Sequence, residues 1–545
     1  MRKELAKDFD EIYILDLGGN VRKNPKLSGT THNVFGIQVG VSINIFVRRG
    51  SSDYTKKRRC AIYYHAIGQD WLKEEKYDFL DQKGSVSGVK WKKLKPDDRG
   101  NWITNDTDEE FQSFLPIGSK EAKAGSSVPA IFRDYSLGVS TNRDSVAYDF
   151  DAKRLAKRVE QFADDYNAEL NRWQKKGKPA DVDNFVSYTK IKWSRDLKLK
   201  LEREVEISFN PRCIRDAIYR PFTRLKLYTK NPVVDREGTL EFFPTKNISD
   251  ENQVIYSSNH CQIPFMVFAG NLIFDAGVAG RAGQCFPRFT YSADGKHKQE
   301  NITPKARTLF QIFYDDDGIT AADIFHYVYA VLHHPAYRTR FAENLKRDLP
   351  RIPFVGVGRD GVSPSHKSEK TKNGTPTRHP SQIQFYPLAA VETMQGNYKP
   401  DHNPKASAKL FHEFAEAGKK LAELHVNYES AKEFKLQRQE NKEVKLDWRV
   451  EAMKLTKDKS AIIYNDFLTL AGIPPDVFDY KLGNRSALEW VIDQYRVTRD
   501  EKGNIASDPN RMDDEEYIVR LVGQVITVSM ETLETICSLP KIQPE

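Results

Sequence analysis

The stretch EIYILDLGGN, residues 11–20, decides how the N-terminal part of the chain folds. Its apolar side chains run almost without a break from Ile12 to Leu17, and a polar Gly-Gly-Asn turn ends the run. Such a continuous apolar strand is typical of the central sheet of an α/β domain, where both faces of the strand are buried. A helix is predicted over residues 2–9 and a second long strand over residues 34–47. The segment therefore predicts part of an α/β sheet.

The strands around this segment are too few for a complete α/β domain. One further strand is predicted over residues 61–65 and a short helix over residues 71–80. A polar stretch over residues 88–118 follows, and then a Gly/Ser-rich linker over residues 122–128. Because segments of this composition commonly separate domains, we expect a domain boundary here.

The chain beyond the linker has a mixed pattern of helices and strands. Apolar residues recur at spacings of three and four in residues 149–174, which predicts a long amphipathic helix. Short strands with turns are predicted over residues 190–291. Residues 358–380 have almost no apolar side chain, which predicts a flexible insertion. Further helices are predicted over residues 321–332, 404–452, 486–495 and 513–538.

Composition excludes several classes of protein. The chain has 545 residues and 62.6 kDa, more than one hydrophobic core normally supports, so at least two domains are expected. An apolar content of 39% and a mean hydropathy of -0.63 are typical of a soluble globular protein. No apolar run approaches the roughly 18 residues of a membrane-spanning helix, and the charged N-terminus is not a secretory signal. We therefore expect a cytoplasmic protein without a membrane partner, in which the five well-separated cysteines are buried, reduced thiols.

Positive charge is concentrated in one part of the sequence. The formal net charge of the whole chain is +8. Residues 190–230 alone contain twelve basic and five acidic side chains, a local excess of +7. Such a concentration predicts a polyanionic partner.

Two basic segments of this region alternate with aromatic residues. A strand over residues 219–228 would present one row of side chains on a single face, because side chains alternate along a strand. That row consists of Arg220, Phe222, Arg224 and Lys226. A similar mixture surrounds Arg288, and a surface of this kind can grip phosphates. The alternative is that the aromatic residues are core and that the arginines pair with Asp216 or Asp275.

The glycine-rich residues 277–283 allow three interpretations. They superficially suggest a dinucleotide-binding turn, but no helix follows to hold a phosphate at its N-terminus. They also suit a loop whose backbone and Arg281 approach DNA, or a tight connection between strands. His333-His334 indicates a helix cap and Asp315-Asp316-Asp317 a solvated turn, with metal binding as the alternative for each. Because no P-loop and no Ser/His/Asp or Cys/His constellation is present, no independent catalytic site is predicted.

Several segments, taken in order, make the chain resemble the C-terminal part of Type ISP restriction-modification enzymes, the single-polypeptide relatives of Type I systems. They are FDEIYILDLGGN (9–20), VFGIQVGV (34–41), TNRD (141–144), YRPF (219–222), LPRIP (349–353) and DYKLGNRSALEW (479–490). The resemblance covers nearly the whole chain. In this family one polypeptide carries a nuclease, a helicase-like ATPase, a γ-class adenine-N6 methyltransferase and finally a target recognition domain.

The resemblance implies a mixed α+β fold in two parts. Residues 1–120 would be the C-terminal remnant of the methyltransferase domain, with an incomplete α/β sheet. Residues 126–545 would be the target recognition (specificity) domain, a large mixed α/β domain whose last part, residues 404–545, is helical.

The resemblance also implies that cofactor chemistry lies elsewhere. The glycine-rich S-adenosylmethionine loop and the Asn-Pro-Pro-Tyr or Asp-Pro-Pro-Tyr motif occur nowhere in the chain. In the family these motifs lie upstream, so we expect the chain to begin inside the methyltransferase and not to be catalytically self-sufficient. S-adenosylmethionine, ATP and Mg would belong to the intact family enzyme, and no cofactor is expected on this chain alone.

The implied function is sequence-specific recognition of double-stranded DNA. The partner would be an upstream methyltransferase, helicase and nuclease part, or a separate subunit. Phe35 matches the position at which γ-class enzymes place an aromatic ring against the flipped adenine; the alternative is a buried strand residue. The DNA-binding candidates combine donor chemistry with loops or basic segments: Asn142, Arg143, Arg220, Arg224, Lys226, Arg281, Gln284, Arg288, Lys296 and Lys298. A second hypothesis is a protein-interaction subunit that docks onto a separate methyltransferase or translocase.

Overall fold

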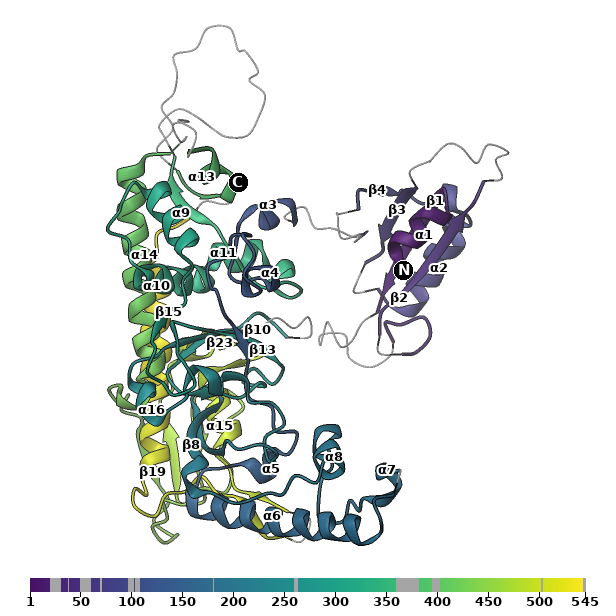
Figure 1. The fold of residues 1–545 in the computed structure, drawn as a ribbon. Coiled ribbons are helices and arrows are strands. Elements are labelled where there is room, and N and C mark those ends of the chain that lie inside the picture. The colour runs from purple at the N-terminus through teal and green to yellow at the C-terminus, as the bar shows by residue number, and fades with distance from the viewer. Residues whose placement is uncertain are drawn as a thin grey trace. The chain divides into compact units, whose positions relative to one another are not determined.

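The chain forms two compact units, Met1–Glu109 and Glu110–Glu545, which are described separately (Figure 1). The computed structural model describes residues 1–19, 31–37, 39–49, 60–68, 71–96, 102, 108–179, 181–258, 263–358, 382–394, 402–500 and 503–542. Beyond Gly358, the flexible insertion predicted over residues 358–380 lies outside the described residues. None of the helices in these ranges is long and apolar enough to cross a membrane.

The first unit is a four-stranded sheet with a helix on each face. Its elements are α1 (Arg2–Asp8), β1 (Glu11–Gly18), β2 (Val41–Val47), β3 (Ala61–Ala66), α2 (Lys73–Lys83) and β4 (Lys92–Leu94), in the strand order β2-β1-β3-β4. β1 runs parallel to β3 and antiparallel to β2. Ile12 packs on one face with Leu5 of α1, and Leu15 packs on the other with Phe79 of α2. The buried strand predicted from residues 11–17 is confirmed.

The strand predicted over residues 34–47 is wrong in its first half, because β2 begins only at Val41. The Asn33 side chain accepts a hydrogen bond from the Phe35 backbone N–H at 2.9 Å and donates one to the Val39 carbonyl at 2.6 Å. These bonds fold the chain into turns before the strand starts. β2 pairs only with β1 among the described strands, and most of its side chains are exposed. It is an edge strand, not a strand buried on both faces.

The first part of the second unit is rich in short strands. Its elements are α3 (Asp108–Ser113), β5 (Leu115–Pro116), α4 (Lys120–Lys123), β6 (Ser136–Leu137), α5 (Asp144–Ala147), β7 (Tyr148–Asp149), α6 (Ala152–Lys175), α7 (Val182–Phe185), α8 (Arg195–Glu202), β8 (Ile214–Arg220), β9 (Thr223–Tyr228), β10 (Val254–Ser258), β11 (Val267–Gly270), β12 (Ile273–Phe274), β13 (Gly283–Pro287), β14 (Phe289–Thr290) and β15 (Gln299–Glu300). Two sheets have the strand orders β11-β10-β13-β6 and β12-β8-β9-β7. α6 confirms the predicted amphipathic helix, and the Asp151 side chain caps it by accepting from the Arg154 backbone N–H at 2.6 Å.

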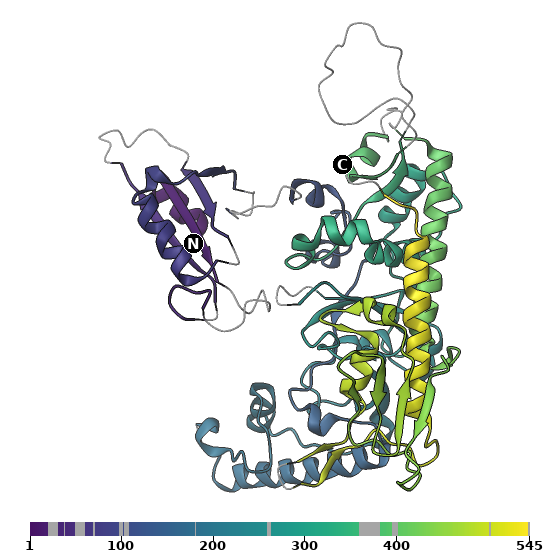
Figure 2. The same cartoon turned by 180° about the vertical axis from the view of Figure 1, so that it is seen from behind.

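The second part of this unit is built on long helices. Its elements are α9 (Pro304–Tyr314), α10 (Ala321–His333), α11 (Pro335–Arg340), α12 (Ala342–Leu345), β16 (Arg351–Ile352), β17 (Phe354–Val357), β18 (Ile383–Tyr386), α13 (Leu388–Met394), α14 (Pro404–Val426), β19 (Gln437–Glu440), β20 (Lys454–Leu455), β21 (Ala461–Ile463), β22 (Leu468–Ala471), β23 (Lys481–Leu482), β24 (Arg485–Ser486), α15 (Ala487–Gln494), β25 (Thr498–Arg499), β26 (Ile505–Ser507) and α16 (Tyr517–Ser538). α10 confirms the helix predicted over residues 321–332 and begins with a capping box of Thr320 and Asp323. α14 packs against α10 and α16, and α14 and α16 run along one edge of the unit (Figures 1 and 2).

The prediction of a helical C-terminal part over residues 404–545 is only partly correct. α14 ends at Val426, and the segment predicted as helix up to residue 452 also contains β19. This strand belongs to a four-stranded sheet of the order β19-β22-β21-β20, whose other three strands follow residue 452. The charged residues of β19 form an exposed sheet edge. Because an exposed edge strand and an exposed helix are both rich in charge, the composition of this segment did not distinguish them.

Residues 110–120, which the sequence analysis assigned to the first domain, pack in the second unit. Phe111, Phe114 and Leu115 are fully or almost fully buried there, and Leu115 pairs with Ile352 of β16. The cysteines also differ from expectation. Only Cys285 is buried, Cys60 and Cys213 are half-buried and Cys537 is exposed, all as free thiols, while Cys261 lies outside the described residues.

Candidate nucleic-acid interface

Asn142 lies at the tip of a tight turn formed by residues 141–144. Its backbone has φ 55°, a left-handed conformation that asparagine tolerates better than most residues. The Thr141 hydroxyl donates to the Asp144 carboxylate and accepts from the Arg143 backbone N–H at 3.1 Å. The Asn142 side-chain amide donates to Asp235 Oδ2 at 2.7 Å. The turn therefore presents an exposed carboxamide in a defined place.

Arg143, the next residue of this turn, is a buried cross-link. Its side chain is 1% exposed. Nη1 donates to the Val233 carbonyl and to Asp235 Oδ1, both at 2.8 Å, and Nη2 donates to Ser194 Oγ at 2.6 Å. A guanidinium in this position ties the turn to the start of α8 and presents no donor at the surface. Arg143 therefore has a structural role, and its side chain is not placed to contact a base.

Arg220 is also held inside the protein. Its Nη1 forms an ion pair with Asp275 Oδ1 at 2.9 Å, and the Tyr148 hydroxyl donates to Oδ2 of the same carboxylate at 3.1 Å. Burial raises the pKa of Asp275 to about 6, while Arg220 opposes that rise. The neighbouring Tyr219 hydroxyl donates to Asp144 Oδ2 at 3.0 Å, and burial raises the pKa of Tyr219 so that it stays protonated. Tyr219 therefore holds the Asn142 turn, and Arg220 pairs with Asp275, as the alternative interpretation predicted.

The single strand predicted over residues 219–228 is a hairpin. β8 ends at Arg220, and Phe222 lies in the turn with φ 55° and a buried ring, 1% exposed. The alternating row of side chains is broken there, so the predicted basic face does not exist as one surface. Arg224 pairs with Glu429 at 2.9 Å and Lys226 with Asp216 at 2.6 Å.

Arg236 and Arg281 are exposed donors in two different segments. The segment of Arg281 follows Ala276, whose backbone N–H donates at 2.8 Å to the carbonyl of Val139, two residues before the turn begins. The backbone of Arg236 makes two hydrogen bonds with Ser140, each of 3.0 Å. Arg281 lies in residues 277–283, which connect β12 to β13 without a following helix, and the Tyr256 hydroxyl donates to its carbonyl at 3.0 Å. Neither guanidinium has a hydrogen-bond or ion-pair partner within the described part of the chain. Arg236 could not be predicted from the sequence, because an isolated arginine in a loop carries no pattern.

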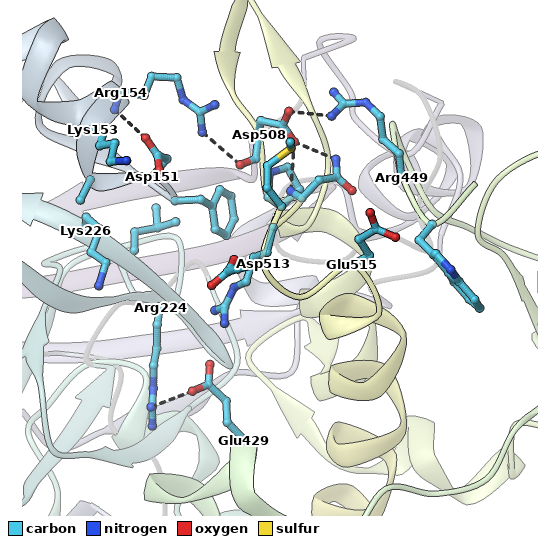
Figure 3. A pocket seen from close by; sticks show the side chains of 18 of the residues that line it. Asp151, Lys153, Arg154, Arg224, Lys226, Glu429, Arg449, Asp508, Asp513 and Glu515 are labelled. Carbon is cyan, nitrogen blue, oxygen red and sulfur yellow. Dashed lines mark hydrogen bonds and ion pairs between the residues drawn. The ribbon is translucent and has the colours of Figure 1, made fainter. Parts of the chain in front are cut away.

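A pocket of about 1100 Å³ lies between the start of α6, the β8–β9 hairpin and two C-terminal segments (Figure 3). Its charged residues have both signs: Asp151, Lys153, Arg154, Asp216, Arg224, Lys226, Glu429, Asp447, Arg449, Asp508, Arg511, Asp513 and Glu515. Several of these charges neutralise one another, as Arg224 does with Glu429 and Arg449 with Asp508, both at 2.9 Å. The pocket is therefore not a continuous basic groove. Sequence reasoning missed Arg449 and Arg511, which are remote from the basic window.

The remaining candidates lie along β13 and the β14–β15 hairpin. Gln284 is half-buried in β13, between β10 and β6. Arg288 and Lys298 both lie over the Phe289 ring, at 4.9 and 4.2 Å from its centroid. Lys298 also pairs with Glu251 at 2.9 Å, and Lys296 lies 3.7 Å from Asp294, so both lysines have acidic neighbours. The structure does not bring these four candidates into the Asn142 turn.

In the first unit, Phe35 is presented by a firmly held turn. Its side chain is 71% exposed, so it is not the buried strand residue of the alternative interpretation. Lys76 of α2 is fully buried, and its Nζ donates to the carbonyls of Leu17 and His32, both at 2.6 Å. Burial lowers the pKa of Lys76. The Tyr77 hydroxyl donates to the carbonyl of the residue before Phe35 at 3.0 Å. The exposed ring is thus held beside the end of β1.

Three solved structures are similar to the whole chain. One is a nuclease-deletion mutant of the Type ISP restriction-modification enzyme LlaGI in complex with a DNA substrate mimic, with 29% identity and a TM-score of 0.73. The second is a DrdV–DNA complex, with 29% identity and a TM-score of 0.74. The third is the ATP-dependent Type ISP restriction-modification enzyme LlaBIII bound to DNA, with 26% identity and a TM-score of 0.75.

Each similarity covers 100% of this chain but only 45%, 49% and 32% of the three longer chains, in that order. The chain thus spans less than half of each of these proteins. The search of curated proteins found no match. The model of one protein family, described as the Type ISP C-terminal specificity domain, matches residues 130–360 and 405–521, well over half of the chain. Together these findings confirm the predicted resemblance and the mixed α/β fold: the chain belongs to the family of Type ISP C-terminal specificity domains.

Proposed function

We propose that this chain recognises a specific sequence in duplex DNA for a Type ISP restriction-modification system. The observation that carries the proposal is the set of exposed donors at Asn142, Arg236 and Arg281, held on backbone segments that are linked to one turn region. Membership of the specificity-domain family supports it, as do the three similar structures, which are complexes with DNA or a DNA substrate mimic.

The side-chain chemistry of this set suits the major groove. An asparagine carboxamide can bond both N6 and N7 of adenine, and an arginine can bond both O6 and N7 of guanine. Asn142 contributes the first kind of donor, and Arg236 and Arg281 contribute the second. Asp235 holds the Asn142 amide in the free protein. We therefore assign base contacts to these three residues.

The hydrogen bonds around the Asn142 turn limit how much this turn can move. Asp144 of the turn accepts a hydrogen bond from the Tyr219 hydroxyl, and the next residue, Arg220, pairs with Asp275. Arg143, which is part of the turn, also holds it in place by its ion pair with Asp235. Because a preorganised binding surface loses less conformational entropy when it binds, this rigidity favours recognition. Arg143 and Tyr219 therefore act as positioning residues in the proposed site.

Separate substitutions of Asn142→Ala and Arg281→Ala test the base contacts. Each variant is expected to lose about 1–3 kcal/mol of discrimination between the right and the wrong base at one base pair of the recognised site, because that is the usual contribution of a bidentate contact. The measurement is the dissociation constant for the best duplex and for duplexes with single base-pair changes. Lys419→Ala, on the exposed side of α14, is the matched control and should leave every ratio unchanged. Equal discrimination by the variants and the unsubstituted chain would remove these residues from the site.

We also propose that the first unit completes an adenine-N6 DNA methyltransferase whose S-adenosylmethionine and catalytic motifs lie upstream or in a partner. Two observations support this. The β2 edge has no second strand neighbour in the described structure and exposes Ile43 and Ile45, and the Phe35 ring is held in solvent, where a flipped base would find it. ATP and Mg would belong to the intact family enzyme, and such a system would act in the cytoplasm. Methyl transfer to DNA by this chain alone would contradict the proposal.

A further inference from the structure

The second unit carries a helical arm at one end. It consists of the C-terminal half of α6, the short helix α7, the helix α8 and the segment between α7 and α8, residues 186–194 (Figure 1). A small apolar core holds these parts together, in which Tyr166 packs against Trp193 with ring centroids 5.9 Å apart and Trp173 packs edge-on against Phe185 at 5.0 Å. The arm is therefore a defined structure and not a loose loop.

The segment between α7 and α8 turns its basic side chains outward. Ile191 and Trp193 are buried in the arm, 2% and 6% exposed, while Lys190 and Lys192 between and beside them are exposed. Tyr188 is 59% exposed, which is unusual for so large an aromatic side chain. The outer surface of the arm thus combines cations with an exposed aromatic ring.

Two of the cations of this surface are not neutralised by the protein. Lys190 pairs with Asp165 at 2.8 Å, and Lys198, whose Nζ lies 5.4 Å from the centroid of the Tyr188 ring, pairs with Asp183. Lys192 and the exposed Arg195 have neither an ion-pair nor a hydrogen-bond partner among the residues that the structure describes. Their nearest acidic neighbour in the chain, Asp196, is not paired with either of them. This surface can therefore accept an anionic partner without breaking an internal ion pair.

The arm is joined directly to the turn that presents Asn142. Ser194 caps α8 by accepting from the Leu197 backbone N–H at 3.2 Å, and it also accepts from Arg143 Nη2 at 2.6 Å. Arg143 is the residue next to Asn142. Ser194 in turn lies between Lys192 and Arg195 in the sequence. The buried Arg143 guanidinium thus connects the segment that carries the two cations to the turn that carries Asn142.

We propose that Lys192 and Arg195 bind phosphates of the duplex beside the base pairs that the Asn142 turn reads. This inference rests on the proposed function. The contact would strengthen binding to DNA without distinguishing one base pair from another. Flexible exposed cations suit this role, because backbone phosphates are the same at every base pair. Each phosphate that is neutralised releases counterions. Each contact therefore makes the slope of log K against log salt concentration steeper by about 0.9.

The double variant Lys192→Ala/Arg195→Ala tests the arm, with the full chain and a labelled duplex of random sequence as the probe. The slope of log K against log salt concentration should become less steep by about 2, and affinity at 50 mM salt should fall roughly tenfold. The base preference of the variant, measured on a random duplex pool, should stay unchanged. The control Lys419→Ala/Lys420→Ala removes the same charge from the exposed side of α14 and should leave the slope as it is.

The outcomes separate this inference from the proposed function. If the unsubstituted chain binds with a steep salt slope and the arm variant has the same slope, the arm inference is overturned and the proposed function stands. That result would instead favour an acidic protein segment as the partner of the arm. A changed base preference in the arm variant would also overturn it. If the unsubstituted chain does not bind duplex DNA at all, both proposals fall.

Discussion

Gly418→Ala is expected to lower the free energy of unfolding of the second unit by about 3 kcal/mol, because α14 meets α10 there without any side chain between the backbones. An alanine Cβ at this position would lie 1.9 Å from the His326 carbonyl oxygen and 3.1 Å from the Ala330 nitrogen. Both atoms belong to the α10 backbone and cannot rotate away. Alanine favours a helix over glycine by about 1 kcal/mol, which is too little to offset the clash. The helices must therefore separate.

Urea denaturation measures the loss of stability, and hydrogen exchange of the native protein shows which helices are affected. Amides of α10 and α14 should lose protection in the variant, while amides of the first unit keep theirs, since Gly418 belongs to the second unit. Glu416→Ala changes an exposed side chain of the same helix and should shift stability by less than about 0.5 kcal/mol. Equal protection of α10 in Gly418→Ala and in the unsubstituted chain would show that the two helices do not meet at Gly418.

Lys76→Met is expected to lower the stability of the first unit by about 3 kcal/mol, since the carbonyls of Leu17 and His32 both lose their donor. Methionine fills nearly the same volume but carries no N–H group. The two carbonyls belong to the end of β1 and to the turn before Phe35, and Lys76 Nζ joins them at 2.6 Å each. Loss of this link should free the turn that presents the Phe35 ring.

Hydrogen exchange of residues 31–37 gives the readout for this variant. Faster exchange is expected in the turn and at the end of β1, with the second unit unchanged. Lys83→Met removes an exposed lysine from the same helix and serves as the control, with a shift of less than about 0.5 kcal/mol. If Lys76→Met left both stability and exchange as they are, the buried ammonium would not be what holds the Phe35 turn.

The spacing of apolar residues correctly predicted those elements in which buried residues recur at one regular interval. The apolar run from Ile12 to Leu17 and the three-and-four spacing of residues 149–174 each match a single structure, and both are confirmed. The segment before Val41 could not be predicted in this way, because its turns depend on the side chain of Asn33, which bonds two backbone groups. The exposed strand β19 was missed for a different reason, since exposed strands and exposed helices have similar compositions.

The candidate site was predicted as a set of residue types but not as a geometry. Asn142 and Arg281 are exposed, as the loop positions suggested, whereas Arg143 and Arg220 are held by Asp235 and Asp275, both remote in sequence. Which arginine is paired is decided by contacts across the fold. The sequence contains both the arginines and their acidic partners, but no pattern in it indicates which of them form a pair. For the same reason the unpaired cations of the arm could be recognised only in the folded chain.

Selection of bound duplexes from a random pool by the full chain tests whether the chain recognises a specific DNA sequence. One enriched sequence is expected, bound at least about a thousandfold more tightly than random duplex at physiological salt. This binding is also expected to weaken steeply as salt is raised. Binding without an enriched sequence would contradict the claim that the chain reads bases. Salt-insensitive, DNA-independent association with a protein partner, together with no binding to duplex DNA, would instead favour the protein-interaction subunit.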